Sequence, residues 1–259
     1  MRKLIGRLVV ALTFLGAATA MAGVIAYDNT CAGCSNQYYG NLLGLDFEVN
    51  SPIDVVALGM YDGGNDYTQE IFAGQDGVSG VTIAIYSINQ MGCGTPAGGG
   101  ASTDCDPELI AEVQFTAAGF DTTTDTYTGG VSINADEFLY LASAVTLGPG
   151  AYSVVAYNDQ NWNSNGGSNS YTTENSGDGA ITFGGSGRFA PQPGCGYAGS
   201  PPGCPAVSDS TFPIYVDGGP SDRYMAGTFI FTAVPEPSTL GLIGLGLVGV
   251  WALRRRRRA

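Results

Sequence analysis

Apolar and polar residues alternate through much of the middle of the chain, and glycine, proline and aspartate separate the alternating runs. The clearest run spans residues 43–49, where leucine, phenylalanine and valine alternate with glycine, aspartate and glutamate. Successive side chains of a β-strand point to opposite faces, so a period of two predicts strands that bury one face. The chain is therefore expected to fold around sheets, and a long-helix bundle is excluded.

The same criteria predict nine further strands. They span residues 53–61, 81–88, 110–116, 126–133, 137–142, 151–158, 180–183, 212–216 and 228–233. Asp-Gly dipeptides such as Asp178-Gly179 lie between the runs, and both residue types tolerate the positive φ of tight turns. Because helical patterns do not alternate with these strands, we expect an all-β fold: an antiparallel β-sandwich of jelly-roll or immunoglobulin-like type.

The first 22 residues have the pattern of a secretory signal peptide. Basic residues among the first seven precede an apolar stretch over residues 8–18, and Ala20-Met21-Ala22 forms a small-x-small cleavage site. We expect a signal helix at residues 1–22 and a mature chain that begins near Gly23.

The last 26 residues have a second targeting pattern, which begins with Pro235, Glu236 and Pro237. The two prolines favour a stiff, extended segment that suits the groove of a processing enzyme. An uncharged apolar run over residues 240–253 is followed by Arg254, Arg255, Arg256, Arg257 and Arg258, a cytoplasmic stop-transfer block. As a helix, residues 239–253 would extend about 22 Å, less than the ~30 Å hydrocarbon core. The pattern therefore predicts a single transmembrane helix that anchors the chain temporarily.

This tail resembles the PEP-CTERM sorting signal of Gram-negative bacteria, in its Pro-Glu-Pro motif, apolar helix and arginine run. The resemblance implies that the chain stays in the inner membrane until an exosortase-type membrane protease processes it, and that it then reaches the outer surface or the biofilm matrix. Together with the N-terminal pattern and the predicted strands, the tail divides the chain into a signal peptide (1–22), an exported β-sandwich domain (23–233) and a sorting tail (234–259). Residues 44–157 more loosely resemble the β-sandwich domains that often precede such tails, which implies a fold and no activity.

Composition excludes several classes of function. The chain has no histidine, so it has no Ser-His-Asp triad and no histidine-ligated zinc. Residues 23–233 contain 22 acidic and 2 basic residues, and this net charge of -20 repels nucleic acid. Together with the location that the resemblance implies, this leads us to expect a non-catalytic cell-surface or matrix protein with no catalytic residues, no required cofactor and no nucleic-acid partner.

The chain has six cysteines, all in its exported part. They are Cys31, Cys34, Cys93, Cys105, Cys195 and Cys204. An even number outside the cytoplasm favours disulfides, and the simplest of fifteen connectivities joins neighbours: 31 to 34, 93 to 105 and 195 to 204. The alternative for the Cys-Ala-Gly-Cys segment at residues 31–34 is a redox motif.

Two loops contain candidate binding residues. Asp62, Asn65, Asp66 and Glu70 supply several hard oxygen ligands, which predicts a calcium site; the alternative is a solvated turn. Trp162 lies between Asn161 and Asn163, close to Tyr157, and an aromatic face with neighbouring amides suits the binding of a sugar ring of an extracellular polysaccharide. The alternative is an aromatic residue packed over the end of the sandwich.

These loops lead to a second hypothesis, a carbohydrate-binding module or adhesin, with or without calcium. A third hypothesis is a glycosidase or polysaccharide lyase, because 23 acidic residues leave room for a catalytic pair of carboxylates. No motif identifies such a pair.

Overall fold

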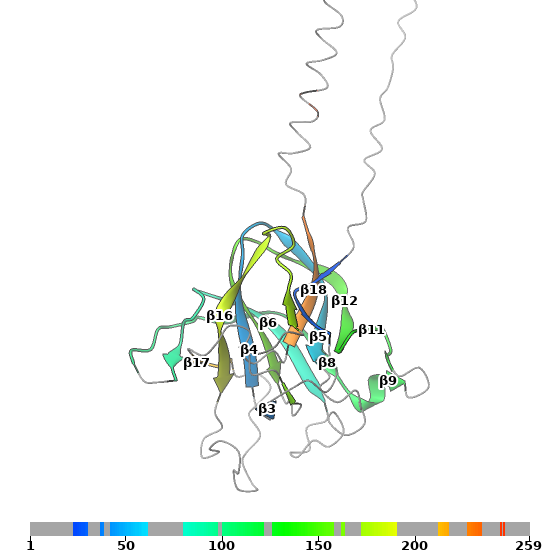
Figure 1. Cartoon of the computed structure of the whole chain (residues 1–259), viewed down its shortest axis with the longest axis horizontal. Helices are drawn as coiled ribbons and strands as arrows, with labels where there is room; N and C mark the ends of the chain where they lie inside the picture. Colours follow the sequence, from blue (N-terminus) through cyan, green and yellow to red (C-terminus); the bar gives the residue numbers. More distant parts are fainter. Residues whose placement is uncertain are drawn as a thin grey trace, which may run out of the picture.

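The strands predicted from the sequence form two large sheets in the computed structural model (Figure 1). The structure describes residues 23–30, 37–38, 42–61, 80–97, 100–121, 126–157, 162–163, 172–190, 212–217, 227–234, 244 and 246. The described part of the chain is nearly all β, and all of its strand pairs but one are antiparallel.

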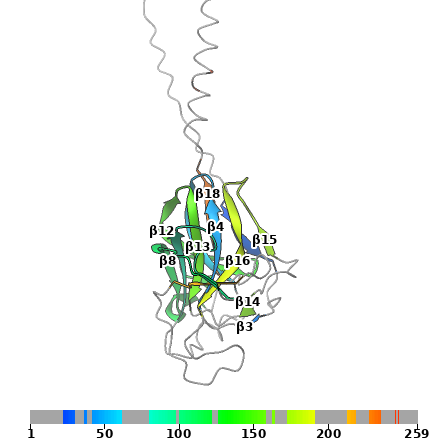
Figure 2. The same cartoon turned by 90° about the vertical axis from the view of Figure 1, so that its left-hand side faces the viewer.

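The larger sheet has seven strands, and Figure 2 shows several of them side by side. Their order is β7 (Thr95–Pro96), β17 (Tyr215–Asp217), β16 (Ile181–Ala190), β4 (Leu42–Val49), β13 (Gly150–Tyr157), β6 (Val81–Ile88) and β8 (Glu108–Phe115). Only the short β7–β17 pair is parallel.

The smaller sheet has five strands, in the order β1 (Val24–Ile25), β18 (Gly227–Ala233), β5 (Ile53–Tyr61), β12 (Asp136–Leu147) and β11 (Gly130–Ile133). Three two-stranded sheets complete the described strands. They pair β10 (Thr126–Tyr127) with β9 (Phe120–Asp121), β14 (Trp162–Asn163) with β3 (Gln37–Tyr38), and β15 (Thr172–Glu174) with β2 (Tyr27–Asn29). A 3-10 turn, η1 (Ala117–Gly119), precedes β9.

One hydrophobic core contains side chains from both large sheets. In β4 it takes the alternate residues Leu43, Leu45, Phe47 and Val49, as the period of two predicted. The ring of Phe47 lies 4.8 Å from the ring of Phe229 in β18, centroid to centroid, so the two sheets are in contact. Removing these apolar side chains from water is the main force that holds the sheets together.

The opposite face of the seven-stranded sheet is buried as well. Leu42, Ala84 and Val155 belong to a second cluster that contains Cys93 and Cys105. The segment that these two cysteines begin and end, residues 93–105, is called the disulfide loop below; through Cys93 and Cys105 it helps to cover a face that alternation alone predicts to be polar and solvated.

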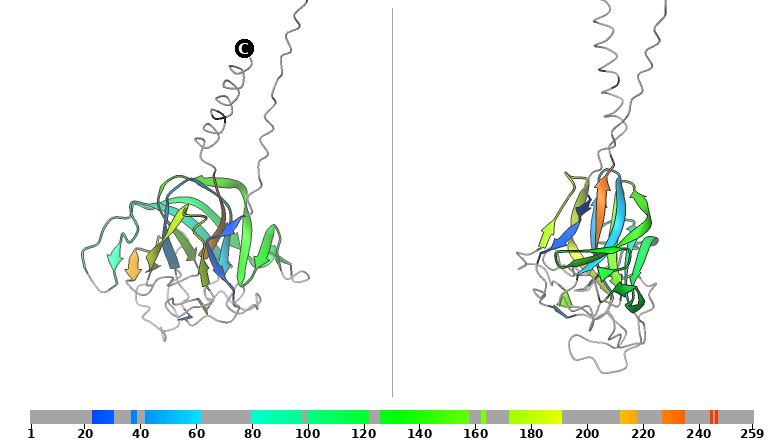
Figure 3. Two further views of the ribbon diagram at one scale, coloured as in Figure 1. Left: turned by 45° about the horizontal axis from the view of Figure 1, so that its top comes forward. Right: turned by 90° about the vertical axis from the view of Figure 1, so that its right-hand side faces the viewer.

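The register places both chain ends of the domain at one end of the sheets, called the terminal pole below. β1 begins and β18 ends there (Figures 1 and 3), and Ala233 is paired with Ile53. The opposite pole contains the end of β5, at Tyr61, and the end of β13, at Tyr157. The β3–β14 pair also lies toward the opposite pole (Figures 1 and 2).

Several local predictions are confirmed and others need correction. Asp178 and Gly179 both have positive φ, at 58° and 90°, as their turn required. The strand predicted at 126–133 is instead two strands, because a turn at Gly129, with φ of 80°, separates β10 from β11. The predicted signal helix and sorting helix lie outside the described residues, apart from Gly244 and Gly246, which are helical. Within the described ranges, no helix combines the length and apolar character that crossing a bilayer requires.

Candidate functional site

The strand that leads into the C-terminal tail is held firmly in the domain. β18 lies between β1 and β5, and its Phe231 is completely buried. After the strand ends at Ala233, the amide of Val234 donates a hydrogen bond to the carbonyl of Pro52 at 2.9 Å. Backbone structure therefore continues up to the residue before Pro235.

The predicted N-terminal cleavage site is adjacent to the same strand. Val24 is the register partner of Phe231, and the amide of Ala26 donates to the carbonyl of Phe229 at 2.9 Å. A Cβ on Gly23 would lie 2.5 Å from a methyl group of Ile230, so any residue other than glycine at the predicted start of the mature chain would require Ile230 to shift. The two predicted processing junctions thus flank one pair of strands at the terminal pole.

Many predicted site residues lie outside the described residues. These are the sorting residues Pro235, Glu236 and Pro237, the stop-transfer residues Arg254 to Arg258, the calcium candidates Asp62, Asn65, Asp66 and Glu70, the glycan candidate Asn161, and Cys31, Cys34, Cys195 and Cys204. In the chain, the segment 62–70 follows Tyr61 and residue 161 follows Tyr157, so both candidate segments continue from strands that end at the opposite pole. In the part of the chain that the structure describes, no group of three or more acidic or cysteine residues is arranged to hold a metal ion.

The glycan-site prediction needs one correction. Trp162 and Asn163 form β14, and Trp162 is the backbone partner of Tyr38 in β3. Tyr157 has an exposed fraction of 1%, and its hydroxyl donates a hydrogen bond to the hydroxyl of Tyr86. Because its ring lies in the second apolar cluster, Tyr157 has no face available to stack on a sugar.

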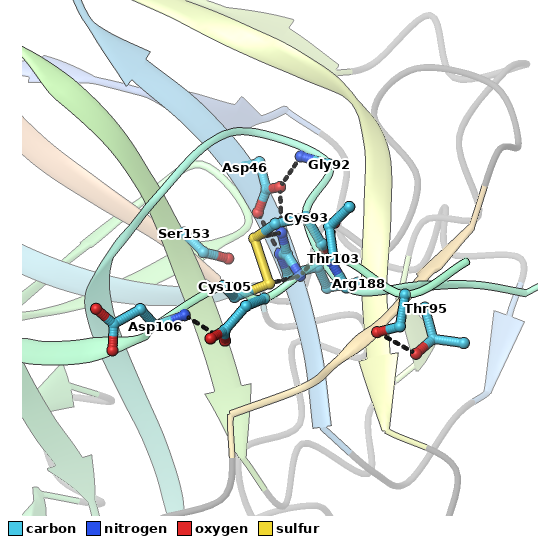
Figure 4. The surroundings of a disulfide bond; sticks show 12 residues. Asp46, Gly92, Cys93, Thr95, Thr103, Cys105, Asp106, Ser153 and Arg188 are labelled. Atoms are coloured by element: carbon cyan, nitrogen blue, oxygen red, sulfur yellow. Dashed lines mark hydrogen bonds and ion pairs between the residues drawn. A yellow bond between two sulfur atoms is a disulfide. The ribbon is translucent and has the colours of Figure 1, made fainter. Parts of the chain in front are cut away.

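Cys93 and Cys105 form a disulfide, with Cα atoms 5.2 Å apart (Figure 4). This is the middle one of the three predicted pairs. Within the loop, Gly94 forms a bridge with Thr103, with hydrogen bonds of 2.9 and 3.0 Å between their main chains. Gly94 has a φ of 113°, and a Cβ there would lie 2.2 Å from the carbonyl oxygen of Ile214, so the loop requires glycine.

Beneath the disulfide lies a buried ion pair between Arg188 of β16 and Asp46 of β4 (Figure 4). Arg188 has an exposed fraction of 0% and Asp46 of 2%. Nε of Arg188 donates to Oδ1 of Asp46, and Nη2 donates to Oδ2 at 2.7 Å, so the guanidinium and the carboxylate meet in two parallel contacts.

The remaining hydrogen bonds of this pair go to the chain that covers it. Oδ2 of Asp46 accepts from the amide of Gly92 at 2.8 Å, and Nη1 of Arg188 donates to the carbonyls of Cys93 at 2.9 Å and Pro213 at 3.4 Å. The guanidinium carbon also lies 4.9 Å from the ring centroid of Phe212, within the range of a cation–π contact. Both charges are therefore compensated, as burial requires.

Sequence reasoning did not identify this cluster. Its only local signal is that Arg188 is one of two basic residues in residues 23–233. Its partner Asp46 is 142 residues away, and pairing of β16 with β4 brings them together by placing Arg188 opposite Gly44.

A second buried carboxyl group lies at the start of β12. Burial is the main reason that the pKa of Asp136 is well above its ordinary value, and the nearby Asp28 and Glu137 raise it further. The amide and the side-chain Nδ2 of Asn29 each donate a hydrogen bond of 2.9 Å to this carboxyl group, and these two bonds lower its pKa. These contacts tie β2 to β12.

Comparison with known proteins identifies one feature of the chain. The PEP-CTERM protein-sorting motif matches residues 233–257, which begin at the last residue of β18. Neither the curated proteins nor the solved structures contain a match to the chain.

Proposed function

Because the chain carries a PEP-CTERM protein-sorting motif, we propose that it is a non-catalytic cell-surface or extracellular-matrix protein, released from a temporary membrane anchor by an exosortase-type protease. The motif itself indicates an exported protein that is sorted through its C-terminus, and it implies processing by an exosortase-type membrane protein. We propose in addition that the chain ends at the cell surface or in the matrix, that its domain is a jelly-roll or immunoglobulin-like sandwich, and that it has no catalytic activity.

The observation that carries the proposal is the position of the motif directly after the folded domain. Main-chain hydrogen bonds extend to Val234, and the sorting residues begin at Pro235. Six residues, 234–239, separate β18 from the apolar run, a span of at most about 20 Å. A protease at the membrane surface would therefore meet the motif next to the terminal pole, where β1 also begins.

The charge distribution supports a role outside the cell. Five of the chain's ten basic residues follow the apolar run. Removal of the tail would remove these five residues and leave an acidic product. Such a product resists adsorption to anionic membranes and nucleic acids and suits association with neutral or cationic matrix components.

The test is a pair of substitutions in the tail. Pro235→Ala combined with Glu236→Ala is expected to leave the full-length chain in the inner membrane, while the control Ser238→Ala is trimmed and exported normally. Immunoblots of membrane, surface and medium fractions, with the intact mass of each product, measure this outcome. Normal trimming and surface delivery of the Pro235/Glu236 variant would refute the sorting mechanism.

A second candidate function is carbohydrate binding, with or without calcium. The pairing of β14 with β3 favours it, because this ladder has Trp162 opposite another aromatic residue, Tyr38. Trp162→Ala is expected to abolish retention on a polysaccharide column, whereas Tyr140→Ala, which removes an aromatic side chain that is 54% exposed on β12, leaves it intact. If the chain binds no polysaccharide, this candidate function is rejected and the structural role remains. If a chelator does not change the melting temperature, the calcium site is rejected.

A further inference from the structure

The guanidinium group of Arg188 contacts both sulfur atoms of the disulfide. Its Nη2 lies 3.2 Å from Sγ of Cys93, and its Nη1 lies 3.6 Å from Sγ of Cys105. A cation at this distance stabilises a thiolate over a thiol, and a thiolate is the form of cysteine that reacts in disulfide exchange. Because Arg188 and Cys93 are both fully buried, solvent and salt screen this attraction only weakly.

The strand pairing that brings Arg188 and Asp46 together does not involve the disulfide loop. Pairing of β16 with β4 places Arg188 opposite Gly44, and Asp46 lies two residues further along the same face of β4. The pair then holds the main chain around Cys93: Asp46 accepts from the amide of Gly92, and Arg188 donates to the carbonyl of Cys93. A reduced loop therefore has the same docking contacts available.

The two cysteines differ in their access to solvent. Cys105 is 5% exposed and is flanked by the exposed residues Asp104 and Asp106, whereas Cys93 is completely buried against Arg188. An external oxidant reaches Cys105 more easily, and Cys93 is the better placed of the two to be held as a thiolate.

We propose that the Arg188–Asp46 pair is a template for oxidation of the disulfide loop, in which Arg188 holds Cys93 as the resolving thiolate. Cys105 loses its proton to solvent, and its sulfur attacks one sulfur of a disulfide oxidant, which forms a mixed disulfide and releases one thiolate of the oxidant. The Cys93 thiolate then attacks Sγ of Cys105, which forms the Cys93–Cys105 bond and releases the second thiolate. Protons from solvent convert both released thiolates to thiols, so one oxidant disulfide is reduced for each protein disulfide formed.

The first test titrates Cys93 in the full chain, purified in detergent, with Cys105→Ser. Ultraviolet thiolate absorbance is recorded against pH, and a reference with both cysteines replaced by serine is subtracted. Cys93 is expected to have a pKa at least about one unit below the ordinary thiol value near 8.5. Arg188→Gln is expected to raise this pKa and Asp46→Asn to lower it further, because the first removes the cation and the second removes the anion that neutralises it.

The opposite directions separate the proposal from a purely structural role, in which either substitution would disturb the loop in the same way. A pKa of Cys93 at or above the ordinary value, or shifts of the same sign in the two variants, would overturn the proposal. Arg223→Gln removes one positive charge at the other arginine of residues 23–233 and is expected to leave the pKa of Cys93 unchanged. If Arg223→Gln shifts this pKa as much as Arg188→Gln does, the effect comes from net charge and the proposal is overturned.

Circular dichroism checks that each variant folds. If Arg188→Gln does not fold, Arg188→Lys replaces it and is expected to place the Cys93 pKa between the parent value and the ordinary value; a pKa outside that interval counts against the proposal.

The second test follows the reaction with glutathione disulfide as oxidant. The reduced chain with Arg188→Gln, or with Arg188→Lys where the first does not fold, is expected to close the loop at least about threefold more slowly than the parent at neutral pH. Cys93→Ser is expected to accumulate a glutathione adduct on Cys105, and Cys105→Ser to accumulate much less on Cys93, as measured by peptide mass spectrometry. An unchanged rate, or adducts mainly on Cys93, would contradict the mechanism. These measurements are independent of sorting, so their failure is distinguishable from failure of the proposed function.

Discussion

Val24 lies opposite Phe231 in the ladder between β1 and β18, so the beginning and the end of the exported domain are joined in one sheet. β18 is flanked on its other side by β5, and it places Phe229 and Phe231 in the main core. The five-stranded sheet therefore cannot be completed until β18, the last strand before the tail, is available to pair.

We expect Phe231→Ala to destabilise the domain by about 3–5 kcal/mol, because it opens a cavity in a core where this ring is fully buried. Urea unfolding followed by tryptophan fluorescence or circular dichroism measures the loss. The neighbouring Thr232→Ala removes a partly buried side chain and is expected to cost less than about 1 kcal/mol. Equal effects of the two substitutions would contradict the assigned packing of β18.

Replacing Cys93 and Cys105 together by serine is expected to lower the free energy of unfolding by about 3 kcal/mol. The sequence separation is 12 residues, and the loss corresponds to the chain entropy that such a loop regains in the unfolded state. Denaturant unfolding of the two proteins gives the value directly. An unchanged unfolding midpoint would mean that the disulfide loop contributes no constraint.

The Arg188–Asp46 pair is expected to show strong coupling in a double-mutant cycle. Arg188→Met or Asp46→Leu alone leaves an uncompensated buried charge and is expected to cost about 3–5 kcal/mol. The double variant replaces the pair with apolar side chains and is expected to recover most of that loss. Additive losses in the double variant would show that the two charges do not compensate each other.

Stability is expected to decrease as the pH rises through the titration of Asp136. Burial raises the pKa of Asp136 above 3.8, so the folded state holds this proton more tightly than the unfolded state does. The free energy of unfolding therefore falls from about pH 4 upward until the folded pKa is passed, and it levels off beyond it. Urea unfolding across this range is expected to show a shallower decline in Asp136→Asn. Asp178→Asn, at an exposed site, is the control for the loss of one charge. Parallel pH profiles in the parent, Asp136→Asn and Asp178→Asn would show that Asp136 does not cause the decline.

The sequence predicted β4, β5, β6 and β13 well because their alternation is local information, but the ranges 137–142 and 180–183 cover only part of the two longest strands, β12 and β16. The predicted ranges 53–61 and 81–88 coincide with β5 and β6, and the turn at Asp178-Gly179 forms as expected. The short strands β1, β2 and β14 were missed, because two or three residues contain no detectable period. Their pairing is defined by partners far away in the chain, such as Phe231 for Val24.

The same limit applies to the functional residues. The tail motif was identified from consecutive residues, and the Cys93–Cys105 pair from its short separation. The Arg188–Asp46 pair was not identifiable, because Asp46 has the place of a solvent-facing residue in an alternating strand. It is buried because the disulfide loop, Gly92 and the segment with Phe212 and Pro213 pack over that face.

The cover over the outer face of β4, β6 and β13 includes one short loop that is closed by a single sulfur–sulfur bond. A chain retained in the reducing cytosol would lack the Cys93–Cys105 disulfide, and the apolar patch of Leu42, Ala84 and Val155 would be exposed to solvent more often. Chaperones and proteases recognise exposed apolar patches, so a chain that is not exported would be degraded faster than one in which the disulfide has formed.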